Sequence, residues 1–234
     1  MSRAGRGAPA APTERFVIEV GERRVSALHV RPRAPAALLV LGHGAGAGMT
    51  HPFMESLAAA LAASGVATLR YQFPYAEAGS RRPDPRALLT ATVRAAVLAG
   101  MKRARGVPLL AGGKSMGGRM TTLAAAEAPL PHVRGIVLVG FPLHPAGRPG
   151  TERAEHLAAV APPLLLLSGT RDALAPLSLL RPVCARLGAR AELREIAGAD
   201  HGFAVLKRSG RTPGDVMTEL ASAVRAFADR VARA

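Results

Sequence analysis

Apolar and polar positions along the chain follow two different periods. The run at 36–41 (AALLVL) is apolar throughout, as in a strand that is buried on both faces of a sheet. Other segments repeat their apolar residues every three to four positions, as amphipathic helices do. The clearest of these has one apolar stripe, formed by Val216, Leu220, Val224, Phe227 and Val231. The pattern therefore predicts a chain in which strands and helices alternate.

Turn and capping residues predict where these elements begin and end. Strands are expected at 16–20, 24–30, 36–41, 66–70, 107–111, 136–139, 164–168 and 191–196. Helices are expected from 52 onward, at 87–105, 116–127, 151–160 and 177–187, and from 213 to the end. Thr50 is expected to cap the first helix, with Pro52 in its first turn, and Thr212 to cap the last. Apolar strands that alternate with helices predict an α/β protein with a doubly wound, mostly parallel sheet, in which ligands bind at the carboxyl ends of the strands.

The chain is expected to form one domain, because no repeat or internal linker divides it. That domain is expected to span 15–234, after a disordered tail at 1–14. The first fifteen residues contain no apolar stretch of the kind that a secretory signal has. The longest apolar run, 157–167, is interrupted by two prolines and is too short to cross a membrane. These features predict a cytoplasmic protein that does not enter a membrane.

The strong positive charge suggests another class of protein. The formal net charge is +15, and three of the 31 basic residues are lysines, which leaves 28 arginines. Clustered cations bind nucleic-acid phosphates, but no purely basic run here exceeds two residues, and aromatic residues make up 3% of the chain. The chain is also rich in Ala, Gly and Pro, as GC-rich coding would give. We therefore expect no nucleic-acid partner.

Metal and disulfide chemistry has little support in the composition. Cys184 is the only cysteine, so an internal disulfide or a cysteine-based zinc site is excluded, and it is expected to be buried on a helix face. The seven histidines lack the spacing of metal ligands. No metal is expected.

Two glycine-rich segments resemble cofactor-binding motifs, but each lacks a required feature. The segment 42–47 (GHGAGA) fits the dinucleotide pattern G-x-G-x-x-A, and Arg70 ends the next strand, a position that suits NADP. However, Pro52 would fall inside the helix that this motif requires. The segment 113–115 ends like a phosphate-binding P-loop, but Pro108 stands where that motif needs a glycine. No cofactor is expected.

The segment 113–117 (GKSMG) also has the G-x-S-x-G pattern of a nucleophilic serine. The pattern alone is only moderately specific, but Ser115 lies between an apolar strand and a helix, as a sharp nucleophile elbow requires. The flanking glycines are expected because a Cβ there would clash with neighbouring backbone. The alternative is a glycine-rich helix start in which the serine is only a cap.

A nucleophilic serine needs a base, and the base needs an acid that orients it. Asp172 follows the strand at 164–168 and His201 follows the strand at 191–196, so both fall in loops at the same sheet edge as Ser115. Asp200 is a rival acid, but adjacent residues usually point apart. We therefore expect Asp172 to orient His201.

Several segments carry a resemblance to a known family, namely 43–48, 73–75 with 81–84, 112–119, 141–145 and 199–201. On these segments the chain resembles a small α/β-hydrolase without a cap domain. Within that superfamily it is similar to the dienelactone-hydrolase-like branch, which includes a testis-expressed hydrolase-like protein and a histone-acetyltransferase complex subunit. The resemblance covers nearly everything after the tail. The nucleophile is a serine rather than the cysteine of dienelactone hydrolases, so the substrate of those enzymes does not carry over.

The order of the motifs and their placement in loops predict a serine hydrolase that acts on small or accessible carboxylic esters through an acyl-enzyme, with Ser115, Asp172 and His201 as the catalytic triad. The resemblance implies a hydrolase architecture and the backbone N–H groups of Ala45 and Met116 as the oxyanion hole. Because the branch includes complex subunits, a non-catalytic scaffold or binding protein of the same fold is the alternative. The oligomeric state is left open.

Other residues near these motifs have less certain roles. His43 is expected to shape its loop rather than to act as a second base. His144 is equally compatible with lining the site and with packing its own loop. Lys114 and Arg119 flank the serine, where they would attract anionic substrates, although Arg119 also fits a solvated helix residue.

The connection at 141–163 is expected to be too short for a lid, since part of it forms a crossover helix. An open cleft should result, with 71–75 on one side and 141–144 on the other. Such a cleft should favour small or flexible acyl groups.

Overall fold

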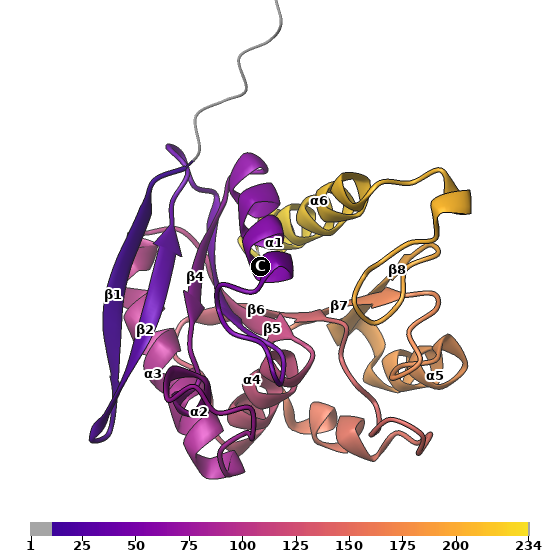
Figure 1. The fold of residues 1–234 in the computed structure, drawn as a ribbon, viewed down its shortest axis with the longest axis horizontal. Helices are drawn as coiled ribbons and strands as arrows, with labels where there is room; N and C mark the ends of the chain where they lie inside the picture. Colours follow the sequence, from indigo (N-terminus) through magenta and orange to yellow (C-terminus); the bar gives the residue numbers. More distant parts are fainter. Residues whose placement is uncertain (1–10, 234) are drawn as a thin grey trace, which may run out of the picture.

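An eight-stranded, mostly parallel sheet forms the centre of the molecule (Figure 1). The structure is a computed structural model that describes residues 11–233. The strands lie in the order β1-β2-β4-β3-β5-β6-β7-β8, so β1 and β8 are the edges. Their bounds are β1 (Thr13–Val20), β2 (Arg23–Val30), β3 (Ala37–Gly42), β4 (Val66–Tyr71), β5 (Leu109–Lys114), β6 (Val133–Val139), β7 (Leu164–Gly169) and β8 (Ala191–Ile196).

Helices cover both faces of this sheet. Figure 1 shows α1 and α6 on one face and α3, α4 and α5 on the other. Their bounds are α1 (Pro52–Ala63), α2 (Pro74–Glu77), α3 (Arg86–Ala104), α4 (Met116–Glu127), α5 (Leu177–Leu187) and α6 (Pro213–Val231), with the 3₁₀ helices η1 (Glu152–Ala159), η2 (Gly188–Arg190) and η3 (Lys207–Ser209). β1 and β2 form an antiparallel hairpin, β2 pairs antiparallel with β4, and the remaining pairs are parallel. The predicted fold class, a doubly wound and mostly parallel sheet, is confirmed.

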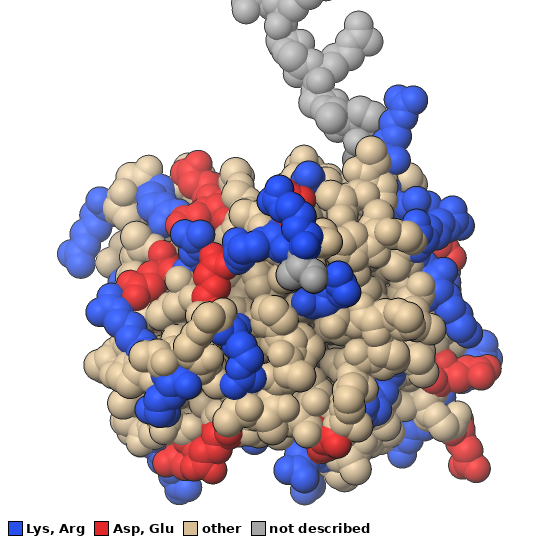
Figure 2. Space-filling view, turned by 180° about the vertical axis from the view of Figure 1, so that it is seen from behind, with Lys and Arg blue, Asp and Glu red and all other residues tan. Residues whose placement is uncertain are grey.

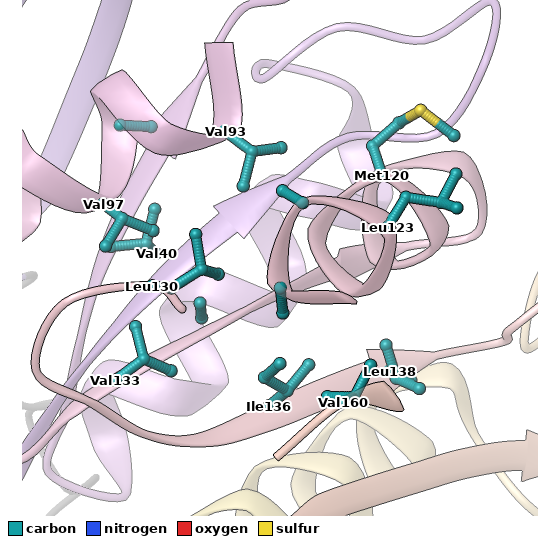
Figure 3. Packing of buried hydrophobic residues seen from close by; sticks show 14 of the residues in the cluster. Val40, Val93, Val97, Met120, Leu123, Leu130, Val133, Ile136, Leu138 and Val160 are labelled. Carbon is teal, nitrogen blue, oxygen red and sulfur yellow. The ribbon is translucent and has the colours of Figure 1, made fainter. Parts of the chain in front are cut away.

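The central strands send alternate side chains into two separate cores. In β6, Ile136 and Leu138 pack on the side of α3 and α4, whereas Val137 and Val139 pack on the side of α1 and α6. Figure 3 shows the first of these cores, in which Ile136 and Leu138 lie near residues of α3 and α4. Because both faces are buried, most positions of these strands are apolar or small, as the sequence pattern predicts for strands of this kind, and charged residues stand only near strand ends, such as Arg70, Lys114 and Arg134.

Several element boundaries agree with the prediction. Helices α4 and α5 and strand β8 have the predicted bounds. The last helix begins after Thr212, whose side chain accepts the N–H of Asp215 while the Asp215 carboxylate accepts the N–H of Thr212. Each of these ends is marked by a local signal in the sequence, such as a capping residue or the change from a strand to a turn.

The first helix is capped by His51 and not by Thr50 as predicted. The Nδ1 atom of His51 accepts the N–H of Phe53 at 3.2 Å. Pro52 is the first helical residue and has no N–H, so the first free donor lies two positions after the cap. The side chain that can reach this donor belongs to the residue directly before the proline.

Several strands extend beyond their predicted ends because they pair with their neighbours, and β1 and β5 are the two that bear on the domain start and on the site. β1 begins at Thr13, which pairs with Val30, so the folded domain starts before the expected residue 15; residues 1–10 of the expected tail lie outside the described residues. β5 continues through Gly112 and Gly113 up to Lys114, in register with β6, although glycine has a low propensity for strands. Pairing with neighbouring strands therefore carries β5 directly to Ser115.

Charged side chains are spread widely over the surface. On the face seen in Figure 2, Lys and Arg side chains lie at many positions with Asp and Glu side chains among them. Some are paired, such as Arg181 with Glu195 at 2.7 Å and Arg225 with Asp229 at 2.9 Å. Within residues 11–233, no helix combines the length and apolar character needed to cross a membrane.

Candidate active site

Ser115 occupies a strained turn between β5 and α4. Its backbone has φ +50° and ψ −113°, in the positive-φ region that non-glycine residues rarely adopt. Its N–H donates to the carbonyl of Val139 on β6 at 3.0 Å, which ties the turn to the sheet. This geometry presents the hydroxyl at the carboxyl end of the sheet and is the elbow that the sequence pattern predicts.

The glycines around Ser115 are required by close backbone packing. A Cβ on Gly113 would lie 2.5 Å from the carbonyl carbon of Gly117 and 2.7 Å from the oxygen of Gly42. A Cβ on Gly117 would clash with the Gly42 carbonyl and would lie 2.8 Å from the oxygen of His43. Real Cβ atoms do not approach backbone this closely, so neither site accepts a side chain without a shift of the backbone. The expected steric role of the two glycines is confirmed.

Three side chains from three loops form one hydrogen-bonded chain. His201 Nε2 lies 3.0 Å from Ser115 Oγ, and His201 Nδ1 lies 2.8 Å from Asp172 Oδ2. Asp172 is buried, and its other oxygen accepts the N–H of Leu174 at 2.8 Å. A carboxylate beside Nδ1 favours the tautomer with the proton on Nδ1, because only that nitrogen can then donate to it. Nε2 is then free to accept the hydroxyl proton of Ser115.

Asp200 does not join this chain. Its Oδ1 atom accepts the N–H of Ala204 at 2.9 Å, and its backbone N–H donates to the carbonyl of Ala204 at 3.0 Å. Asp200 therefore holds the loop that carries His201. The two adjacent side chains point apart, as expected from their positions in sequence.

Lys114 connects the strand before the serine to the loop of the histidine. Its Nζ donates to the backbone carbonyl of His201 at 2.8 Å and lies 5.6 Å from the ring centre of Phe203. Burial lowers the pKa of Lys114 to about 8, although the nearby carboxylates of Asp172 and Asp200 raise it. The sequence pattern did not indicate this contact.

Ser115 lies in a cavity of about 450 Å³ that it shares with Ala45 and Met116. Neither Ala45 nor Met116 donates its backbone N–H to another described residue. Met116 begins α4, so its N–H is one of the unpaired donors at a helix N-terminus. The two residues thus lie where backbone donors are available next to the serine hydroxyl.

The loop that contains Ala45 is held by His43. This side chain is fully buried; its Nδ1 lies 2.8 Å from the Gly44 oxygen, and its Nε2 accepts the N–H of Phe73 at 3.1 Å. Burial lowers the pKa of His43, so the ring stays neutral. Both ring nitrogens are occupied by backbone, which agrees with the expected structural role.

The walls of the cavity differ from the prediction. Tyr71, Phe73 and Tyr75 are buried, and the last two pack edge-on against His43 instead of facing the cavity. On the other expected side, only Pro142 lines the cavity. Aromatic side chains in these loops gain more from burial against the core than from contact with solvent.

His144 also turns away from the cavity. It is buried, with Nδ1 2.8 Å from the oxygen of Pro145, so of the two roles left open it packs its own loop.

Cys184 is buried as expected, and burial raises the pKa of its thiol to about 11.

The wall is formed by residues that the sequence reasoning missed. They are Pro83, Asp84, Arg86, Leu89, Met120, Arg153 and Leu174, together with Arg119, which was left open between two roles. The segment 81–84 was part of the family resemblance, which was the only signal that pointed to this region.

Charged residues of the two segments that resemble cofactor-binding motifs make hydrogen bonds within the protein. Arg70, at the end of β4, donates to the carbonyl of Met49 at 2.7 Å and is buried. Lys114 is turned toward the loop of His201, as described above. Among residues 11–233, no group of three or more His, Cys, Asp or Glu side chains lies close enough to hold a metal ion.

The sequence profile of the family described as "Alpha/beta hydrolase domain" matches residues 35–229. This range includes Ala45, Ser115, Met116, Asp172 and His201, and the chain belongs to this family.

Solved structures of other proteins share the same architecture. A dienelactone hydrolase from Anabaena variabilis superposes with a TM-score of 0.75 at 22% identity, covering 94% of this chain and 98% of that one. A serine hydrolase without a lid from Xanthomonas campestris has a TM-score of 0.71 at 18% identity, with the same coverage. The esterase domain of a Rhodothermus marinus protein has a TM-score of 0.70 at 18% identity, covering 94% and 98%. At these identities the likeness concerns the fold, which is that of an α/β-hydrolase without a cap domain.

Proposed function

We propose that this protein is a serine hydrolase that cleaves carboxylic esters through an acyl-enzyme. The observation that carries the proposal is the unbroken chain of hydrogen bonds from Asp172 through His201 to the strained Ser115. A purely structural role does not require a serine with positive φ to face a cavity with a histidine base behind it. The solved structures named as esterases and hydrolases support the same type of reaction on this fold.

The geometry suits general base catalysis. His201 removes the proton from the Ser115 hydroxyl as the oxygen attacks the ester carbonyl, and Asp172 stabilises the imidazolium that forms. His201 then gives this proton to the leaving alcohol, so the ester bond breaks and the acyl group remains on Ser115. Water attacks the acyl-enzyme in the second half of the reaction, again with His201 as the base.

The negative charge on the carbonyl oxygen would be held by the backbone. We assign this role to the N–H groups of Ala45 and Met116, which lie beside Ser115 in the cavity and have no other partner among the described residues. Each such donor contributes about 100- to 1000-fold to the rate. His43 supports this arrangement indirectly, because it fixes the loop that carries Ala45.

A fluorophosphonate probe tests the proposal directly. The probe should label the wild-type protein and fail to label Ser115→Ala, and the same substitution should abolish hydrolysis of a short-chain 4-nitrophenyl ester. Ser222→Ala, which removes an exposed serine on α6, is the matched control and should change neither result. Labelling of a different residue, or no labelling of folded wild-type protein, would contradict the proposal and favour a binding protein that keeps the hydrolase fold. The narrower similarity to a branch with complex subunits stays a prediction.

A further inference from the structure

Three arginines line the cavity that holds Ser115. They are Arg86 on α3, Arg119 on α4 and Arg153 on η1, and the only other charged residue in the lining is Asp84. Asp84 is already engaged, because its Oδ2 atom accepts the N–H of Tyr75 at 2.7 Å. The cavity therefore has a surplus of positive charge beside the serine.

Arg119 is partly buried, as Arg153 is, whereas Arg86 is exposed. Its Nε atom is buried and has no hydrogen-bond partner among the described residues. Burial lowers the pKa of Arg119, and the positive charges of Arg153 and Arg86 lower it further. A partly buried guanidinium beside two others of the same charge is held at a cost in free energy, and an anion bound in the cavity would offset that cost.

The neighbours of Arg119 do not neutralise it. Arg153 donates one N–H to the carbonyl of His144 at 3.1 Å, which leaves most of its donors available. Arg86 has only a loose and exposed contact, 3.8 Å from Glu127. His156 is held neutral, because burial, then Arg119 and Arg86, lower its pKa to about 4.

We propose that this cavity selects esters whose acyl group carries a carboxylate at its far end. The inference rests on the proposed ester hydrolysis at Ser115 and adds the class of substrate. Ser115 is the N-cap residue of α4 and Arg119 lies about one helical turn later, and both line the same cavity. Hemiesters of dicarboxylic acids such as adipic acid offer an ester carbonyl to Ser115 and a carboxylate to Arg119. Arginine suits this role because its planar donors match a carboxylate in pairs.

Two chromogenic esters of equal acyl length test the inference. Mono-4-nitrophenyl adipate carries the carboxylate, and 4-nitrophenyl hexanoate lacks it. The wild type should have a kcat/KM at least about tenfold higher for the adipate ester, as a charge-assisted hydrogen bond would give. Arg119→Met should lower kcat/KM for the adipate ester about 10- to 100-fold and leave the hexanoate value within about threefold. Arg119→Lys, which keeps the charge but loses the paired donors, should lie between them.

The controls separate a local effect from a general one. Arg134→Met removes an exposed arginine at the start of β6, far from the carboxyl ends of the strands, and should leave both substrates unchanged. Arg153→Met removes a lining arginine on η1 instead of α4. It serves as the second test variant, measured with the same two esters, if Arg119→Met folds poorly. A wild type without preference for the adipate ester, or an equal loss for both esters in Arg119→Met, would overturn the inference.

A binding measurement distinguishes failure of this inference from failure of the proposed function. Calorimetry with Ser115→Ala protein compares monomethyl adipate with methyl hexanoate. Tighter binding of the adipate ester that weakens as salt is added supports the carboxylate site, even where neither ester is hydrolysed. Equal binding of the two esters refutes the carboxylate site, even where Ser115 proves to be the nucleophile.

Discussion

The floor of the cavity and its rim are held in different ways. The floor, defined here as the lining residues Ala45, Ser115 and Met116 together with His201, which contacts Ser115, follows the strands β3, β5 and β8 in the chain. Backbone hydrogen bonds and glycine packing hold these segments. The rim, defined here as Arg86, Arg119 and Arg153, stands on α3, α4 and η1, and its side chains have few hydrogen-bond or ionic partners among the described residues. Substitutions in the floor should therefore affect chemistry or folding, whereas substitutions in the rim should affect only which substrate is preferred.

The largest effect on activity is expected from Asp172→Asn, because Asp172 holds His201 of the floor in place. The asparagine oxygen can still accept the N–H of Leu174, so its amide nitrogen would face His201 Nδ1 and donate to it. The imidazole would then carry its proton on Nε2 and could not accept the serine proton. We expect kcat to fall about 10⁴-fold with unchanged folding, measured with a neutral short-chain ester.

Asp200→Asn is the matched control for this change. Its side chain accepts a backbone N–H in its own loop, a bond that asparagine retains. A loss of activity as large as that of Asp172→Asn would show that Asp200 is the orienting acid after all.

The next largest effect is expected on stability, from Gly117→Ala. The added Cβ would meet the carbonyl groups of Gly42 and His43, which belong to a strand end and cannot move away freely. We expect a loss of about 3 kcal/mol or more in the free energy of unfolding, measured by urea denaturation. Gly44→Ala is the control, since its Cβ would meet only ordinary contacts at 3.7 Å and should cost far less. Equal losses would mean that the elbow is not tightly packed.

Lys114 gives a pH-dependent comparison. Because its pKa is about 8 in the folded protein and 10.5 in an unfolded chain, the unfolded state binds its proton more tightly. Lys114 therefore makes the free energy of unfolding rise with pH between pH 8 and about 10.5. Below pH 8 its contribution does not change with pH. Relative to Lys114→Met, the wild type should become more stable across this window by about 3 kcal/mol.

The difference between the two curves isolates Lys114, because Cys184 and other titrating groups contribute equally to both proteins. Parallel stability curves from pH 7 to 10 would show that the amine is not buried as described.

The smallest effect is expected for the length of an uncharged acyl chain. Residues 11–233 form no cap domain over the sheet, so we expect that nothing has to open before a substrate reaches Ser115. We expect rates with 4-nitrophenyl esters to be highest for short acyl groups and to show no jump above the micellar concentration. A maximum near sixteen carbons, with such a jump, would mean that the cavity is deep or covered.

The floor could be predicted from sequence because each of its parts leaves a local mark. Strand 36–41 is apolar throughout, glycines stand at 113 and 117, and Asp172 and His201 each follow a strand. Parallel strands bring their carboxyl ends to one edge, so chain order alone places these groups together. The extension of β5 through two glycines was missed, because pairing with β6 overrides a weak local preference.

Of the rim, only Arg119 was indicated by the sequence, because it lies close to Ser115 in the chain. Arg86 and Arg153 are far from Ser115 in sequence, and the packing of α3 and η1 beside α4 brings them to the cavity. The hydrogen bond from Lys114 to the carbonyl of His201 could not be predicted either. Every residue has a main-chain oxygen, so the sequence does not indicate which one a lysine will contact. The segment 71–75 was wrongly expected to form a wall of the cavity, because its aromatic side chains are buried in the core.

The two edges of the sheet bear on whether copies of this chain can add to one another strand by strand. Among residues 11–233, β1 and β8 each have one side without a neighbouring strand, and such a row of main-chain groups invites a strand from another molecule to add to it. Both strands present charged side chains along their length, namely Glu14, Arg15 and Glu19 on β1 and Glu192, Arg194 and Glu195 on β8. A copy that docked edge to edge would have to bury these charges, so fibre growth is opposed at both margins of a sheet whose interior is almost entirely apolar.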